Sequence, residues 1–100
     1  MMAIPSNVKL VKFPTTDEID QALFEKALDH FLGKVGNGEL NLAFKEYAKG
    51  GLRVQHEVHG RYTLNGKLFV ASDEKWQLLE AIQSVLKKLE KEVVKQSSKS

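Results

Sequence analysis

The amino-acid sequence predicts an α+β domain of the order β-α-β-β-β-α, in which a four-stranded sheet carries two helices packed on one face. Two long segments place apolar residues at the three- and four-residue spacing of amphipathic helices. Residues 39–47 and 52–64 instead alternate apolar and polar side chains, which is typical of half-buried strands. Asn65 and Gly66 follow the second alternating segment, and this pair is the strongest short signal for a β-hairpin.

The first half of the chain predicts a strand followed by a helix. Residues 7–13 are rich in β-forming side chains and indicate the first strand. Thr15, with Glu18 three residues later, fits a capping box at the start of the helix. Gly36 and the glycines beside it are expected to end the helix. The apolar side chains at helical spacing between these limits are Ile19, Leu23, Ala27, Leu28, Phe31, Leu32 and Val35.

The two alternating segments predict the central strands of the sheet. In residues 39–47, the even-numbered positions from Leu40 to Phe44 are apolar and share one face. Residues 52–64 alternate in the same way, and thirteen extended residues would span roughly 43 Å. Because that length is large for so small a domain, Gly60 is expected to mark a bulge or a bend.

The second half of the chain predicts a last strand and a last helix. Residues 67–72 form the strand, and Ser72 or Asp73 is expected to cap the helix. The apolar stripe of the helix consists of Leu79, Ile82, Leu86, Leu89 and Val93. All elements belong to a single domain over residues 1–96, and the polar residues 97–100 are expected to be a flexible tail.

Composition narrows the class of protein. The chain has 100 residues, 42% of them apolar and 28% charged, which is ordinary for a globular protein. It has no cysteine, so disulfides and thiolate metal sites are excluded. No apolar run approaches the roughly 20 residues of a membrane span, and the N-terminus lacks the apolar stretch of a signal peptide. A cytoplasmic protein is therefore expected.

The last third of the chain resembles a known family. The segment combines an Asn-Gly hairpin, a strand ending in Ala-Ser, and a helix with an Ala-Ile step followed by Lys-Leu and further basic residues. The residues that match are Asn65, Gly66, Ala71, Ser72, Ala81, Ile82, Lys88, Leu89, Lys91 and Lys95. This pattern resembles the ribosome hibernation factors, the family of the ribosome-associated inhibitor and the hibernation-promoting factor.

The resemblance implies a small protein that sits in the mRNA and tRNA channel of the small ribosomal subunit and represses translation by occupancy. It implies ribosomal RNA as the partner, with no membrane, small-molecule substrate, cofactor or catalysis. A free monomer is expected, because the chain ends where the short family members end. The first helix shares in RNA contact in many family members, whereas here it carries the acidic residues Asp17, Glu18, Asp20, Glu25 and Asp29.

The last helix carries the main candidate site. Lys87, Lys91 and Lys95 lie opposite its apolar stripe at the spacing i, i+4, i+8. Like charges at that spacing repel one another by a few tenths of a kcal/mol per pair, and a polyanion would relieve the repulsion. The alternative interpretation is an ordinary solvated face.

The middle of the chain adds further basic residues. Residues 45–67 carry five basic and two acidic side chains, and alternation places Arg53, His59 and Arg61 on the outer face of the sheet. Basic groups beside an imidazole suit phosphates and RNA base edges. The complete set of predicted RNA-binding residues is Lys45, Lys49, Arg53, His59, Arg61, Lys67, Lys87, Lys88, Lys91 and Lys95.

Other functions receive less support from the sequence. His56 and His59 are three residues apart on a strand and should point to opposite faces, so no metal site is expected. Trp76, at the start of the last helix, is expected to belong to the core. One alternative function is a protein-interaction or homodimerisation module that uses the open sheet face or an edge strand. Another is a generic double-stranded RNA binder, although Asp73 and Glu74 stand where lysines are typical of that class.

Overall fold

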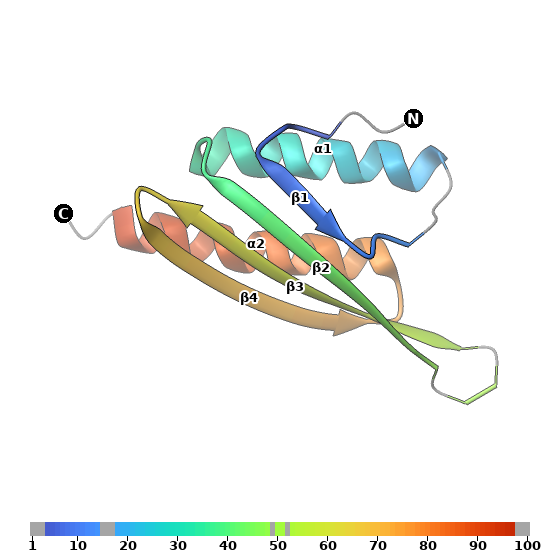
Figure 1. The fold of residues 1–100 in the computed structure, drawn as a ribbon. Coiled ribbons are helices and arrows are strands. Elements are labelled where there is room, and N and C mark those ends of the chain that lie inside the picture. Colours follow the sequence, from blue (N-terminus) through green and yellow to red (C-terminus); the bar gives the residue numbers. More distant parts are fainter. Residues whose placement is uncertain (1–3, 15–17, 49, 52, 98–100) are drawn as a thin grey trace.

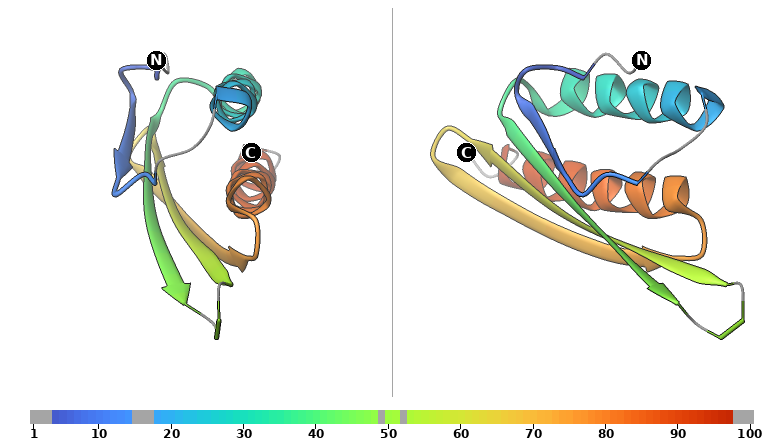
Figure 2. Two further views of the ribbon diagram at one scale, coloured as in Figure 1. Left: turned by 90° about the vertical axis from the view of Figure 1, so that its right-hand side faces the viewer. Right: turned by 45° about the vertical axis from the view of Figure 1, so that its right-hand side comes forward.

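Four strands form one mixed sheet, and two helices cover one of its faces (Figures 1 and 2). The computed structural model describes residues 4–14, 18–48, 50–51 and 53–97. The elements are β1 (Val8–Val11), α1 (Glu18–Val35), β2 (Glu39–Ala48), β3 (Val54–Leu64), β4 (Lys67–Lys75) and α2 (Leu78–Ser97). The predicted fold class and order of elements are confirmed. Thr15, the predicted capping residue, lies outside the described residues.

The strands lie in the order β1-β2-β3-β4. β1 pairs with β2 in parallel, starting at Val8 beside Leu40, while β2, β3 and β4 form an antiparallel meander. The β2–β3 hairpin projects beyond the ends of the helices (Figure 1). One face of the sheet is therefore covered and the other is open.

The core forms between the covered face and the two helices. Alternation along the strands brings one apolar set to the helices, as predicted, and α2 contributes its apolar stripe. The largest side chains that are fully buried there are Tyr62, Phe24, Phe31, Leu28, Leu40, Leu42, Ile82, Leu89, Val58 and Val85. Phe13 closes one end of the core, since its ring stacks on Phe24 at 5.0 Å between ring centroids.

The Tyr62 hydroxyl connects the end of α1 to the middle of the sheet. Tyr62 is fully buried, and its hydroxyl accepts a hydrogen bond from the Gly38 N–H at 2.9 Å. The hydroxyl lies 2.9 Å from the Gly36 carbonyl oxygen and 3.3 Å from that of Val35, so it also caps the helix C-terminus. A Cβ on Gly38 would lie 2.3 Å from the Thr63 carbonyl oxygen, so only glycine fits there.

The predicted hairpin turn is confirmed. Asn65 and Gly66 have φ angles of 52° and 80°, and positive φ at both central residues is the signature of a type I′ turn. This turn type matches the right-handed twist of the flanking strands, so it holds β3 and β4 in register.

Gly60 does not form the predicted bulge. Its pairing with Leu42 on one side and Ala71 on the other is continuous with the neighbouring pairs. A Cβ at this position would lie 2.6 Å from a methyl group of Val85 and 3.0 Å from one of Leu89. The glycine therefore serves the close approach of α2 to the sheet.

The last strand is longer than predicted, and the last helix begins later. β4 continues through Lys75, so Ser72 and Asp73 are strand residues and do not cap α2. The physical reason is that Asp73 has partners on α2, described below, which hold it in the sheet. α2 extends through Ser97, one residue into the predicted tail, and residues 98–100 lie outside the described part of the chain.

The tyrosine contact gives a stability prediction. Tyr62→Phe keeps the ring but leaves the buried Gly38 N–H without its acceptor, which should lower the free energy of unfolding by about 1–3 kcal/mol. Tyr47→Phe is the matched control, because Tyr47 is exposed, and its effect should stay within about 0.5 kcal/mol. Urea unfolding of both variants measures the difference, and equal effects would contradict the capping role.

Two glycines should respond in opposite ways to alanine. Gly66→Ala places a side chain at positive φ and should lower the free energy of unfolding by about 1–2 kcal/mol. Gly33 lies inside α1 with open space around it, so Gly33→Ala should raise the free energy of unfolding by about 0.5–1 kcal/mol. Neither new methyl group contacts another atom, so the shifts in melting temperature report the backbone preference alone, without a change in packing. Shifts of the same sign would show that the turn assignment is wrong.

Candidate nucleic-acid interface

The exposed face of α2 carries a row of lysines. Its opposite face is buried in the core through Ile82, Leu86, Leu89 and Val93, which confirms most of the predicted stripe. Lys87, Lys91 and Lys95 therefore extend into solvent from the side of α2 that faces away from the core. We refer to these three residues as the lysine row.

Lys88 has a structural role as well as a charge. Its Nζ donates to the Ser72 carbonyl oxygen at 3.0 Å and lies 3.4 Å from Asp73 Oδ2. Asp73 also accepts hydrogen bonds from the Ser84 hydroxyl and the Glu74 N–H. These two hydrogen bonds, with Lys88 nearby, lower the pKa of Asp73 from 3.8 to about 2. Asp73 thus anchors α2 to β4.

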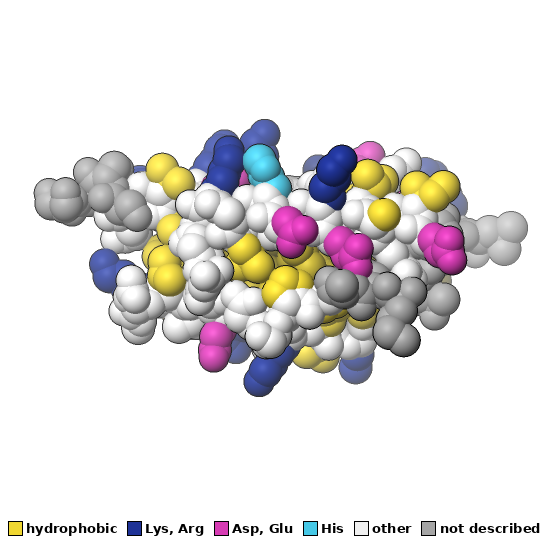
Figure 3. All heavy atoms as spheres, turned by 90° about the horizontal axis from the view of Figure 1, so that it is seen from above, with side chains coloured by type: hydrophobic (Ala, Val, Ile, Leu, Met, Phe, Trp, Pro, Cys, Tyr) yellow, Lys and Arg dark blue, Asp and Glu magenta, His cyan; other side chains and the backbone are white. Residues whose placement is uncertain are grey.

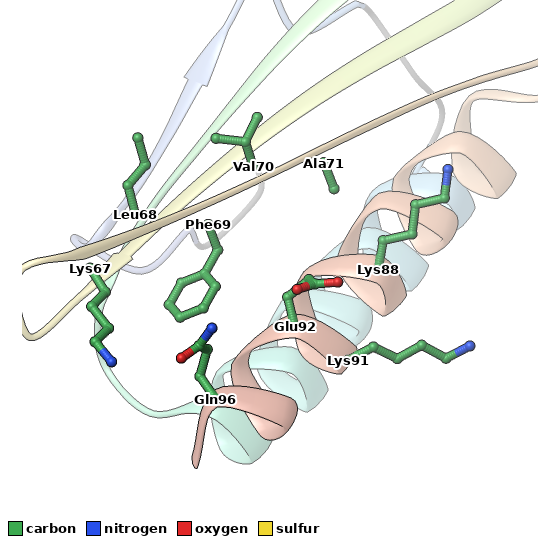
Figure 4. Close-up of a pocket in the computed structure, with 9 residues that line it drawn as sticks. All are labelled: Lys67, Leu68, Phe69, Val70, Ala71, Lys88, Lys91, Glu92 and Gln96. Carbon is green, nitrogen blue, oxygen red and sulfur yellow. The ribbon is translucent and has the colours of Figure 1, made fainter. Parts of the chain in front are cut away.

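Three of the predicted residues meet in a groove between β4 and α2. The groove has a volume of about 650 Å³ and is lined on its charged side by Lys67, Lys88, Lys91 and Glu92 (Figure 4). Since Lys91 also belongs to the lysine row, the basic surface of α2 continues to the edge of the sheet.

The structure places the other predicted residues elsewhere. The register of β2 and β3 and the alternation of their burial place Lys45, His59 and Arg61 on the open face of the sheet. His59 Nε2 lies 2.9 Å from Glu57 Oε1, and the Tyr47 hydroxyl donates to the same oxygen at 3.0 Å. Both contacts lower the pKa of Glu57, so His59 has an acidic partner on this face.

The projecting hairpin carries the remaining predicted residues. Arg53 stands over the ring of Trp76, with its Cζ 4.4 Å from the ring centroid. Trp76 is 47% exposed, so its predicted place in the core is wrong: the extra length of β4 carries it away from the apolar stripe of α2. Lys49 lies outside the described residues.

α1 contributes a basic flank that the sequence analysis missed. Lys26, His30 and Lys34 face α2 and, with Lys87, line a groove of about 550 Å³. Lys34 Nζ lies 3.1 Å from Glu90 Oε1 across this groove. Figure 3 shows basic side chains and a histidine along the rim on the helix side, apart from a row of acidic side chains. The signal was present, because these three residues have the same i, i+4, i+8 spacing as the lysine row.

The described residues contain no candidate metal cluster and no candidate membrane-spanning helix. Among them, no group of three or more His, Asp or Glu side chains could hold a metal ion. His56 and His59 lie on opposite faces of β3. No helix in the described part of the chain is long and apolar enough to cross a membrane.

Comparison with known proteins identifies the fold. No protein-family model matches the chain, and no curated protein sequence matches it. The structure is similar to the N-terminal domain of Thermus thermophilus Protein Y, with a TM-score of 0.58 and 23% identity over 88% of this chain and 92% of that one. It is also similar to a ribosomal subunit interface protein from Coxiella burnetii, with a TM-score of 0.68 and 16% identity over 92% of this chain and 98% of that one. The predicted resemblance is confirmed at the level of the fold.

The anchor at Asp73 predicts a pH-dependent stability. A carboxylate with a lowered pKa contributes stability above its ordinary pKa of 3.8 and loses it as the pH falls toward 2. Asp73→Asn should therefore be less stable than the wild type by about 1 kcal/mol at pH 7, after allowance for solvent screening, and the difference should shrink as the pH falls through 2. Urea unfolding across this range checks the convergence. Asp29→Asn, at an exposed position on α1, is the control, and a constant difference for Asp73→Asn would refute the anchor.

Proposed function

We propose that this chain is a ribosome-associated factor that binds RNA of the small subunit and represses translation by occupying the mRNA and tRNA channel. The lysine row carries the proposal, since it lies on a fold shared with a ribosomal subunit interface protein. Occupancy requires no bond to be made or broken, so the proposal assigns no catalytic residue and no cofactor. A cytoplasmic monomer meets the requirements of this function.

The electrostatics of the helix face support RNA as the ligand. Within the described residues, neither Lys87 nor Lys91 has a carboxylate partner, and each repels the next lysine along the row. Phosphate groups would remove that repulsion, and their condensed counterions would be released. Lys26 and His30 extend the same surface across the groove to α1. The helix side of the molecule therefore carries the principal contact.

The basic residues on the other face have a secondary role in this proposal. Lys45, His59 and Arg61 point away from the helices, so one straight RNA segment cannot reach them together with the lysine row. A protein inside a channel has RNA on more than one side, and these residues, with Lys49 and Arg53, suit a second wall. Lys45→Gln with Arg61→Gln tests that contribution separately.

The decisive variant replaces the lysine row with glutamine. Lys87→Gln, Lys91→Gln and Lys95→Gln together should weaken binding to purified small subunits sharply, because three phosphate contacts are lost. Each lost contact should also flatten the slope of log affinity against log salt by roughly 0.7 to 0.9. The thermal melt should be unchanged or slightly raised, because these lysines repel one another. Sedimentation with small subunits across a salt series measures both affinity and slope.

A second triple variant controls for total charge. Lys9→Gln, Lys12→Gln and Lys75→Gln remove the same charge from exposed positions that are not part of the predicted site. Their affinity and salt slope should stay close to wild type, whereas a general charge effect would change both variants equally. If the folded lysine-row variant kept the wild-type affinity and the wild-type salt slope, the proposal would be wrong. Loss of binding should be accompanied by loss of inhibition in a cell-free translation assay.

A further inference from the structure

The sheet has an open edge along β4. β4 is the last strand in the sheet, and among the described residues only β3 pairs with it. The two-residue turn closes on Leu64 and Lys67, which makes them a hydrogen-bonded pair, and such pairs recur at every second residue. The backbone N–H and C=O groups of Leu68, Val70 and Ser72 must therefore point away from β3.

α2 covers one end of this edge and leaves the rest open. The outward Ser72 carbonyl oxygen accepts the hydrogen bond from Lys88. Within the described residues, no hydrogen bond reaches the outward groups of Leu68 or Val70. The open part of the edge, residues 67–71, forms one wall of the 650 Å³ groove (Figure 4).

The two sides of this edge differ in chemistry. Leu68 and Val70 are 51% and 60% exposed, and Figure 4 shows both side chains pointing away from α2. On the α2 side, the groove presents three lysines and one glutamate. A strand laid along this edge would therefore meet apolar side chains on one face and a net positive charge on the other.

We propose that the β4 edge binds an extended acidic segment of a partner protein, which adds a fifth strand to the sheet. Its backbone would pair with the outward groups of Leu68 and Val70. Because side chains alternate along a strand, every second residue of the segment would be acidic and face the lysines of the groove. The residues between them would be apolar and extend the patch on the open face.

The same geometry disfavours two other occupants. Antiparallel pairing of two β4 edges would continue the sheet with both α2 helices on one side, which brings two sets of groove lysines together. RNA phosphates accept hydrogen bonds but donate none, so they leave the outward carbonyls unpaired and the exposed Leu68 and Val70 uncovered.

The experiment uses a synthetic peptide of about ten residues that alternates valine and glutamate. Amide hydrogen exchange, followed residue by residue by NMR, should show that the Leu68 and Val70 amides exchange rapidly in the free protein and slowly with the peptide. The Phe69 amide, which faces β3, should be protected in both states and serves as the internal control. A valine–lysine peptide should bind at least about tenfold more weakly, because the groove is basic.

Two changes separate strand addition from simple charge attraction. Val70→Pro removes an outward N–H without removing a β3–β4 hydrogen bond, so it should lower the affinity for the peptide about tenfold. Val70→Ala keeps the N–H, and its affinity for the peptide should stay within about threefold of the wild-type value. If Val70→Pro does not fold, a peptide methylated on alternate backbone nitrogens provides the same test on the wild-type protein. Equal binding of the methylated and unmethylated peptides would overturn the proposal. Protection that appears on raising the protein concentration without peptide, or equally with an RNA oligonucleotide, would overturn it too.

Discussion

One buried hydroxyl group ties the C-terminal end of α1 to the sheet. The β1–α1–β2 crossover must return the chain to the sheet within a few residues, and the helix end leaves backbone carbonyls that need donors. The Tyr62 hydroxyl provides the donor and also accepts the Gly38 N–H, so a single side chain of β3 satisfies groups on both sides of the connection. The Tyr62 ring packs edge-on against Phe31 at 5.2 Å, which fixes the helix laterally. Because Gly38 is buried, loss of this hydroxyl leaves its N–H without a substitute partner.

α2 lies beside α1 on the covered face of the sheet, and its contacts with β3 and β4 hold it there. α2 packs over β3 and β4, and Gly60 allows Val85 and Leu89 to approach the backbone of β3 closely. Asp73 then sets the rotation of the helix, since it holds Ser84 and Lys88 on the side toward β4. With these contacts in place, the lysine row can only face solvent. The candidate site is thus a consequence of packing rather than of contacts among the lysines, which repel one another.

Local patterns predicted most of the fold, and contacts between distant segments account for what they missed. The apolar stripe of α2 and the alternation in β2 and β3 repeat over many residues, and the Asn65-Gly66 turn needs only its own two φ angles. The role of Gly60 was predicted wrongly because the residues that require a glycine there, Val85 and Leu89, lie in α2, more than twenty residues away. The true length of β4 depends on Ser84 in the same way. The spacing of the basic residues of α1 could have been recognised in the sequence. The charge summed over the whole helix did not reveal it, because the acidic and basic side chains lie on different flanks.

The helix side and the β4 edge are adjoining surfaces, and Lys88 and Lys91 border both. A strand that places carboxylates beside these lysines would compete with phosphates for the same charges, so the two proposed ligands would bind with negative coupling. By thermodynamic linkage the effect is reciprocal: RNA would weaken the strand as much as the strand weakens RNA. The coupling should be modest, because Lys87 and Lys95 would contribute to RNA binding but do not line the β4 groove, while the outward backbone groups of Leu68 and Val70 would contribute only to binding of the strand. An acidic partner on the β4 edge would then lower the affinity for RNA without abolishing it, and the lysines shared by the two surfaces would determine the size of the effect.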